Sequence, residues 1–84
     1  MTIYEVLNTF IRNNKVNATA RFFKSREDAC FYFSVGVEAL HIRYKEIIET
    51  GDFDELETSN NYLLYDTNNP DDFTERFSII THQV

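Results

Sequence analysis

The segment from residue 26 to residue 50 constrains the fold most strongly, because it carries two side-chain stripes at the spacing of an α-helix. Ser25 and Asp28 form a capping box at its start, and Gly51 stands where a helix can end in the left-handed conformation. A helix with an apolar stripe must bury that stripe against another element. The apolar stripe contains Cys30, Phe33, Val37, Leu40, Tyr44 and Ile47, and the polar stripe contains Ser34, Glu38, His41, Lys45 and Glu49.

The same segment also allows a second interpretation. Residues 31–37 alternate in the manner of a strand and are rich in aromatic and β-branched residues. A hairpin through residues 16–37, followed by a helix over 38–50, would satisfy that alternation. The two caps and two stripes favour one long helix, bent near Gly36.

Residues 3–12 are predicted to form a short N-terminal helix. Their apolar residues recur at the spacing of one helix face, at Ile3, Val6, Leu7, Phe10 and Ile11. Thr2 and Glu5 match a capping box, and the pair Asn13–Asn14 ends the segment.

Three segments are predicted as strands. Residues 16–23 alternate between apolar and polar side chains, residues 62–65 are a short apolar run, and residues 76–82 alternate again. Asp72 and Glu75 could instead cap a short helix within the last segment, while residues 52–57 are expected to form an acidic connector. The sequence therefore predicts an α+β fold, with a small antiparallel sheet of about three strands packed against the N-terminal helix and the longer central helix. A chain of 84 residues can build one modest core, so we expect one domain over residues 1–84.

The compartment is predicted from what the sequence lacks. Cys30 is the one cysteine, so no internal disulfide can form, which is typical of a reducing compartment. The N-terminus has no basic and apolar leader, and no apolar run is long enough for a membrane span. We expect a cytoplasmic protein without a membrane partner, in the host cytoplasm if a phage encodes it.

Charge divides sharply along the chain. Residues 1–45 hold seven basic and four acidic residues, a net charge of +3, whereas residues 46–84 hold ten acidic residues and one basic residue, a net charge of −9. No basic residue occurs between Glu46 and Glu75. Such asymmetry favours a charged partner, although carboxylates also form solvated surfaces that keep a protein in solution.

The histidines and the cysteine do not occur at spacings typical of a catalytic or metal site. His41 lies on the polar stripe, His82 lies in another element, and Cys30 lies on the apolar stripe without a neighbouring base. The spacing of the cysteine and histidines matches no zinc motif, and Asp52–Phe53–Asp54 departs from a calcium loop at Leu56. We expect no enzymatic activity, no metal and no cofactor.

The acidic stretch is therefore predicted to bind a larger protein or nucleoprotein through its basic surface. In size, acidity and lack of catalytic groups, the chain resembles the small anti-defence proteins of phages, including anti-CRISPR proteins and DNA mimics, although no stretch carries a family motif. The resemblance implies inhibition of a host nucleic-acid-binding or defence protein. The predicted protein-binding residues are Glu46, Glu49, Asp52, Phe53, Asp54, Glu55, Glu57, Asp66, Asp71, Asp72 and Glu75.

The sequence also allows two other functions. A homo-oligomeric structural or assembly subunit, such as a homodimer, would use the aromatic segment around residues 31–37 as its interface. Direct nucleic-acid binding could use Arg21, Lys24 and Arg26, but a net charge of −6 repels a phosphate backbone, so we expect no nucleic-acid partner.

Overall fold

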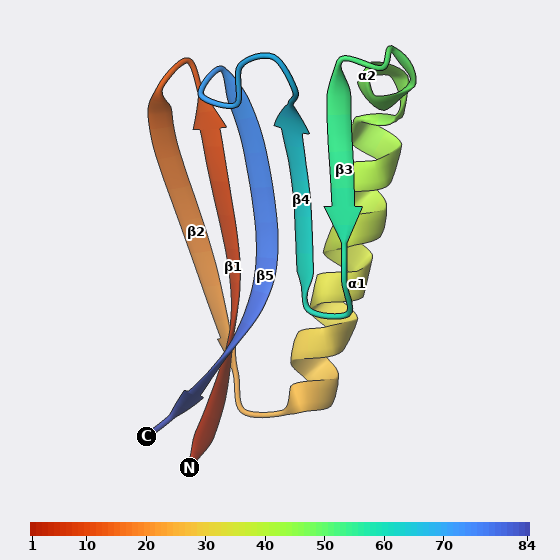
Figure 1. Ribbon diagram of the computed structural model, residues 1–84. Coiled ribbons are helices and arrows are strands. Elements are labelled where there is room, and N and C mark those ends of the chain that lie inside the picture. The colour runs from red at the N-terminus through yellow and green to blue at the C-terminus, as the bar shows by residue number, and fades with distance from the viewer.

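A computed structural model describes residues 1–84. The elements, in chain order, are β1 (Thr2–Arg12), β2 (Lys15–Phe23), α1 (Arg26–Arg43), α2 (Lys45–Glu49), β3 (Phe53–Glu57), β4 (Asn61–Asp66) and β5 (Phe73–Gln83). The strands form one antiparallel sheet in the order β2-β1-β5-β4-β3. Helix α1 packs on one face of this sheet and carries the chain from one edge strand to the other (Figure 1). The α+β class is confirmed, but the sheet has five strands instead of about three.

The predicted N-terminal helix is wrong, because residues 2–12 form the long strand β1. The same apolar residues also suit a strand whose side chains are partly buried on both faces of the sheet. Tyr4, Val6 and Phe10 pack towards the core, whereas Ile3 and the other odd-numbered residues point to the opposite face. Thr2 and Glu5 belong to the strand and cap nothing. Its many aromatic and β-branched side chains favour an extended backbone once neighbouring strands are available.

Asn13 and Asn14 form the tight turn between β1 and β2. Both have positive φ angles, 52° and 66°, as a two-residue type I′ hairpin requires. Asparagine tolerates this conformation better than most residues. The turn sets the register, in which Arg12 pairs with Lys15, and β2 confirms the strand predicted at residues 16–23.

The long central helix is largely confirmed, and the alternative hairpin through residues 16–37 does not form. The Ser25 side chain accepts a hydrogen bond from the Asp28 backbone N–H at 3.3 Å, as the capping box predicts. Gly51 follows α2 with a φ of 83°. The break between α1 and α2 falls at Tyr44, so the expected bend near Gly36 is wrong.

Gly36 instead brings α1 close to the sheet. A Cβ atom at this position would lie 2.6 Å from Cζ of Phe77, a distance that real Cβ atoms essentially never show. The rings of Phe77 and Phe33 stack with their centroids 5.4 Å apart. Because Gly36 has no side chain, the ring of Phe77 can pack directly against α1.

The C-terminal half supplies three strands. The strand predicted at residues 62–65 is confirmed as part of β4, and the strand predicted at residues 76–82 lies within β5, without the alternative helix. The expected acidic connector over residues 52–57 is wrong, because residues 53–57 form the edge strand β3. The buried apolar residues form one cluster between α1 and the sheet: Val6, Ala29, Phe33, Val37, Leu40, Tyr62, Leu64, Phe73 and Phe77.

Candidate protein-binding site

Most of the predicted binding residues collect on α2, on β3 and on the connection between β4 and β5. Helix α2, the start of β3 and the β4–β5 connection lie at the same end of the sheet (Figure 1). Lys45, the first residue of α2, is a basic neighbour of this surface. We call the following carboxylates the acidic surface: Glu46, Glu49, Asp52, Asp54, Glu55, Glu57, Asp66, Asp71 and Asp72.

No lysine or arginine neutralises the acidic surface directly. Every ion pair within 4.0 Å in the structure involves a histidine, although the chain holds eight lysines and arginines and fourteen acidic residues. At the other edge of the sheet, β2 carries Lys15 and Arg21. The acidic surface and the basic residues of β2 thus lie at opposite edges of the sheet.

Some of these carboxylates also stabilise the local backbone. Oδ1 of Asp66 accepts hydrogen bonds from the N–H groups of Asn68 and Asn69, at 2.9 and 3.2 Å, which orders the start of the β4–β5 connection. The carbonyls of Asp72 and Asp71 accept from the N–H groups of Asn13 and Asn14. These bonds use main-chain atoms of Asp71 and Asp72, whose side chains remain exposed.

Two predicted binding residues pack inward, Glu75 as a buried residue and Phe53 as a partly buried one. Glu75 is only 4% exposed and accepts hydrogen bonds from Asn8 Nδ2 at 3.1 Å and from the Tyr44 hydroxyl at 2.6 Å. Burial and the bond to Glu75 raise the pKa of Tyr44 above its ordinary value. Phe53 packs edge-on against Phe73, with 5.3 Å between the ring centroids. Glu75 and Phe53 therefore pack within or against the core and do not belong to the acidic surface.

His41 links the acidic surface to α1, which its place on the polar stripe did not indicate. Its Nε2 lies 3.2 Å from carboxylate oxygens of both Glu55 and Glu57. The buried Tyr62 donates its hydroxyl hydrogen bond to Glu55. Burial, this hydrogen bond and the nearby carboxylates raise the pKa of Tyr62 well above its ordinary value. No group of three histidine, cysteine or acidic side chains in the structure is arranged to hold a metal ion.

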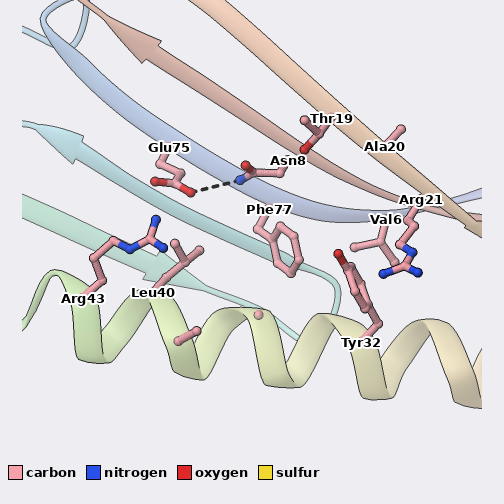
Figure 2. A pocket seen from close by; sticks show the side chains of 12 residues that line it. Val6, Asn8, Thr19, Ala20, Arg21, Tyr32, Leu40, Arg43, Glu75 and Phe77 are labelled. Carbon is pink, nitrogen blue, oxygen red and sulfur yellow. Dashed lines mark hydrogen bonds between the residues drawn. The ribbon is translucent and has the colours of Figure 1, made fainter.

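A groove of about 510 Å³ runs between α1 and the β1–β2 side of the sheet. Figure 2 shows Arg21 and Arg43 among its lining, with the hydrogen bond from Asn8 to Glu75 and the ring of Phe77 between the sheet and α1. The guanidinium of Arg21 lies over the ring of Tyr32, 5.2 Å from its centroid. The groove is thus on the basic side of the molecule and separate from the acidic surface.

Two apolar surfaces have no cover within the chain. The outer side of α1 exposes Phe31, Val35 and Ile42 in one line, with exposed fractions of 73%, 52% and 73%. The sheet face opposite α1, which we call the open face, has no helix on it and includes the exposed side chains of Val16 and Phe22.

No family model, curated protein or solved structure matches the chain. Neither helix has the length and apolar character needed to cross a membrane. The fold and the distribution of charge are therefore the observations on which a function can be argued.

Proposed function

We propose that the protein is a non-enzymatic binding protein that docks on the basic surface of a larger protein or nucleoprotein through its acidic surface. The observation that carries this proposal is the separation of charge. Nine carboxylates lie on α2, on β3 and the turn before it, at the end of β4 and on the β4–β5 connection, and none is paired with a lysine or arginine within 4.0 Å.

Surface carboxylates without a lysine or arginine partner suit recognition better than they suit stability. Carboxylates that repel one another weaken the folded state slightly, whereas a partner of opposite charge relieves that repulsion and associates faster. The inhibitory form of the proposal is a phage-type anti-defence protein. In that form the carboxylates take the place of nucleic-acid phosphates on a host nucleic-acid-binding or defence protein, which is the arrangement that defines a DNA mimic.

The proposal is tested by capture on immobilised protein from a bacterial lysate. We expect basic proteins to be retained at low salt and released at moderate salt, because screening weakens attraction between exposed charges. A variant carrying Glu49→Lys, Asp71→Lys and Asp72→Lys should lose this retention, since none of these side chains makes a hydrogen bond in the structure.

The matched control carries Glu27→Lys, Asp28→Lys and Glu38→Lys, which change the net charge equally but lie on α1. Retention by the control and loss in the first variant support the acidic surface. Equal loss in both variants would show that net charge alone matters, and unchanged retention in the first variant would overturn the proposal.

A second candidate function is a homo-oligomeric structural or assembly subunit. It is supported by the exposure of Phe31, Val35 and Ile42, since an apolar line on the outer side of a helix can be buried against a symmetry mate. This candidate predicts that a variant with Phe31→Lys and Ile42→Lys is monomeric under conditions in which the unchanged protein self-associates.

A further inference from the structure

We propose that two copies of the chain pair through the free edge of β2, joining their sheets into one sheet of ten strands. Strand β2 forms one edge of the sheet, and eight of its nine residues are exposed. An edge strand presents a row of unpaired N–H and C=O groups that can accept another strand. This interface lies on the opposite edge from β3 and goes beyond the proposed function of the acidic surface.

The hairpin register shows which backbone groups of β2 are free. A two-residue hairpin is closed by a hydrogen-bonded pair, here Arg12 and Lys15, and such pairs then alternate along the ladder. The odd-numbered residues of β2 therefore bond to β1. The N–H and C=O groups of the even-numbered residues point away from the sheet, at Val16, Ala18, Ala20 and Phe22.

The sequence of β2 is complementary to itself in one antiparallel register. With a two-fold axis at Thr19, all nine residues of Lys15–Phe23 find partners. Val16 then faces Phe22 of the second copy, and Ala18 faces Ala20 of the second copy. Both members of each pair have free backbone N–H and C=O groups, so each pair can exchange two hydrogen bonds. The two-fold axis repeats both pairs, which gives about eight new hydrogen bonds. Their side chains continue the apolar open face across the junction.

Charge favours the same register. With the axis at Thr19, Arg21 lies opposite Asn17 of the second copy, and no two like charges are directly opposed. Moving the axis to Ala18 places Lys15 opposite Arg21 of the second copy, and moving it to Arg21 opposes two arginines. Like charges directly opposite each other destabilise a strand pair.

The other edge of the sheet is unsuited to this pairing. Strand β3 has only five residues, and three of them, Asp54, Glu55 and Glu57, are acidic. Pairing two copies of β3 antiparallel about Glu55 would oppose two carboxylates. Charged side chains and short length are the usual protection of edge strands, whereas β2 is long and has neither proline nor a bulge. Dimerisation through β2 leaves the acidic surface of each copy free at the far ends of the joined sheet.

Disulfide trapping tests the register directly. In a Cys30→Ser background, Thr19→Cys places two cysteines at the two-fold axis as a non-hydrogen-bonded pair. Their Cα atoms would be about 4.5 Å apart, within the range of a disulfide. We expect mild oxidation to give a covalent dimer of twice the 10.0 kDa chain mass.

The matched control is Asn17→Cys in the same background, on the same strand and the same face. The proposed register separates its two cysteines by four residues, or roughly 13 Å along the strand, so oxidation should give no covalent dimer. Equal trapping of both variants, trapping of Asn17→Cys alone, or no trapping would overturn the proposal.

Light scattering tests the interface without a cross-link. Ala18→Pro removes an N–H that points away from the sheet, and proline is tolerated at such edge positions. We expect the unchanged protein to be dimeric at high concentration, and Ala18→Pro to be monomeric with an unchanged circular dichroism spectrum. The helix variant Phe31→Lys, Ile42→Lys should remain dimeric.

A monomeric unchanged protein, or a dimer that the helix variant dissociates and Ala18→Pro does not, would overturn pairing through β2. Since Ala18→Pro and Thr19→Cys leave every carboxylate of the acidic surface in place, both should still retain a basic partner in the capture assay. The failure of either proposal is thereby distinguishable from the failure of the other.

Discussion

At the scale of single residues, Tyr62 should make the protein sensitive to alkali. Its pKa is raised in the folded state by burial and by the bond to Glu55, whereas an unfolded tyrosine has a pKa of 10.0. The stabilisation is complete below pH 10.0, and it is lost as the pH rises further because only the unfolded chain then releases the proton. We expect the midpoint of urea unfolding to fall above pH 10.0, and Tyr62→Phe to reduce this fall.

Tyr44→Phe serves as a comparison, because the pKa of Tyr44 is also raised but by burial and by Glu75. The variant should likewise reduce the alkaline loss of stability. A Tyr62→Phe protein with the same pH dependence as the unchanged protein would contradict the assignment of the effect to Tyr62.

At the scale of elements, the distance between α1 and β5 depends on Gly36. Gly36→Ala would place a methyl group against the ring of Phe77, which is buried and stacked on Phe33. Overpacking a core costs about 1–3 kcal/mol, while alanine gains about 1 kcal/mol over glycine in a helix, so we expect a net loss of up to about 2 kcal/mol. Chemical denaturation measures this loss.

Two further variants separate crowding from helix propensity. Ser34 lies on an exposed side of α1, so Ser34→Ala should leave the free energy of unfolding unchanged or raise it slightly. Adding Phe77→Leu to Gly36→Ala should cost less than the two single changes together, because the smaller side chain makes room for the methyl group. An additive result would contradict a direct clash.

The elements that the sequence predicted well are those determined by neighbours along the chain. The cap at Ser25, the helical stripes and the stop at Gly51 are local features, and they correctly placed helical structure over most of residues 26–50, although not the break at Tyr44. The alternation of β2 was equally local. Strand β1 was predicted wrongly as a helix, because local spacing does not distinguish the two: its apolar residues fit a helix face as well as a strand. Its partner β5 lies at the other end of the chain.

The candidate site was predicted only in part, because the composition of a segment is local whereas the position of its side chains depends on the fold. Sequence shows which residues are acidic but not which side of an element they occupy. Residues 53–57 form a strand and not a connector, so their side chains alternate. Asp54 therefore lies on the open face, whereas Glu55 and Glu57 point towards His41. The cross-sheet position of Glu75 beside Asn8 and the packing of Phe53 on Phe73 could not be inferred from local spacing.

At the scale of the whole molecule, separated charge should make folding stability depend on salt. The basic partners of the ion pairs are all histidines, so added sodium chloride screens mainly the repulsion among the carboxylates. We expect the melting temperature to rise between low and moderate sodium chloride. The variant with Glu49→Lys, Asp71→Lys and Asp72→Lys should show a smaller rise. A melting temperature that falls with salt would indicate net attraction between the charges and contradict this account.

The sequence by itself determined the long capped helix, the β2 and β4 strands and the division of charge, since periodicity, caps and composition act over a few residues. Only the tertiary structure decided that residues 2–12 are a strand within the sheet, that Glu75 is buried and that β2 is a free edge. Strand pairing joins residues as distant as Thr2 and Gln83. Whether a segment forms a strand, and at which position in the sheet, therefore depends on partners outside that segment.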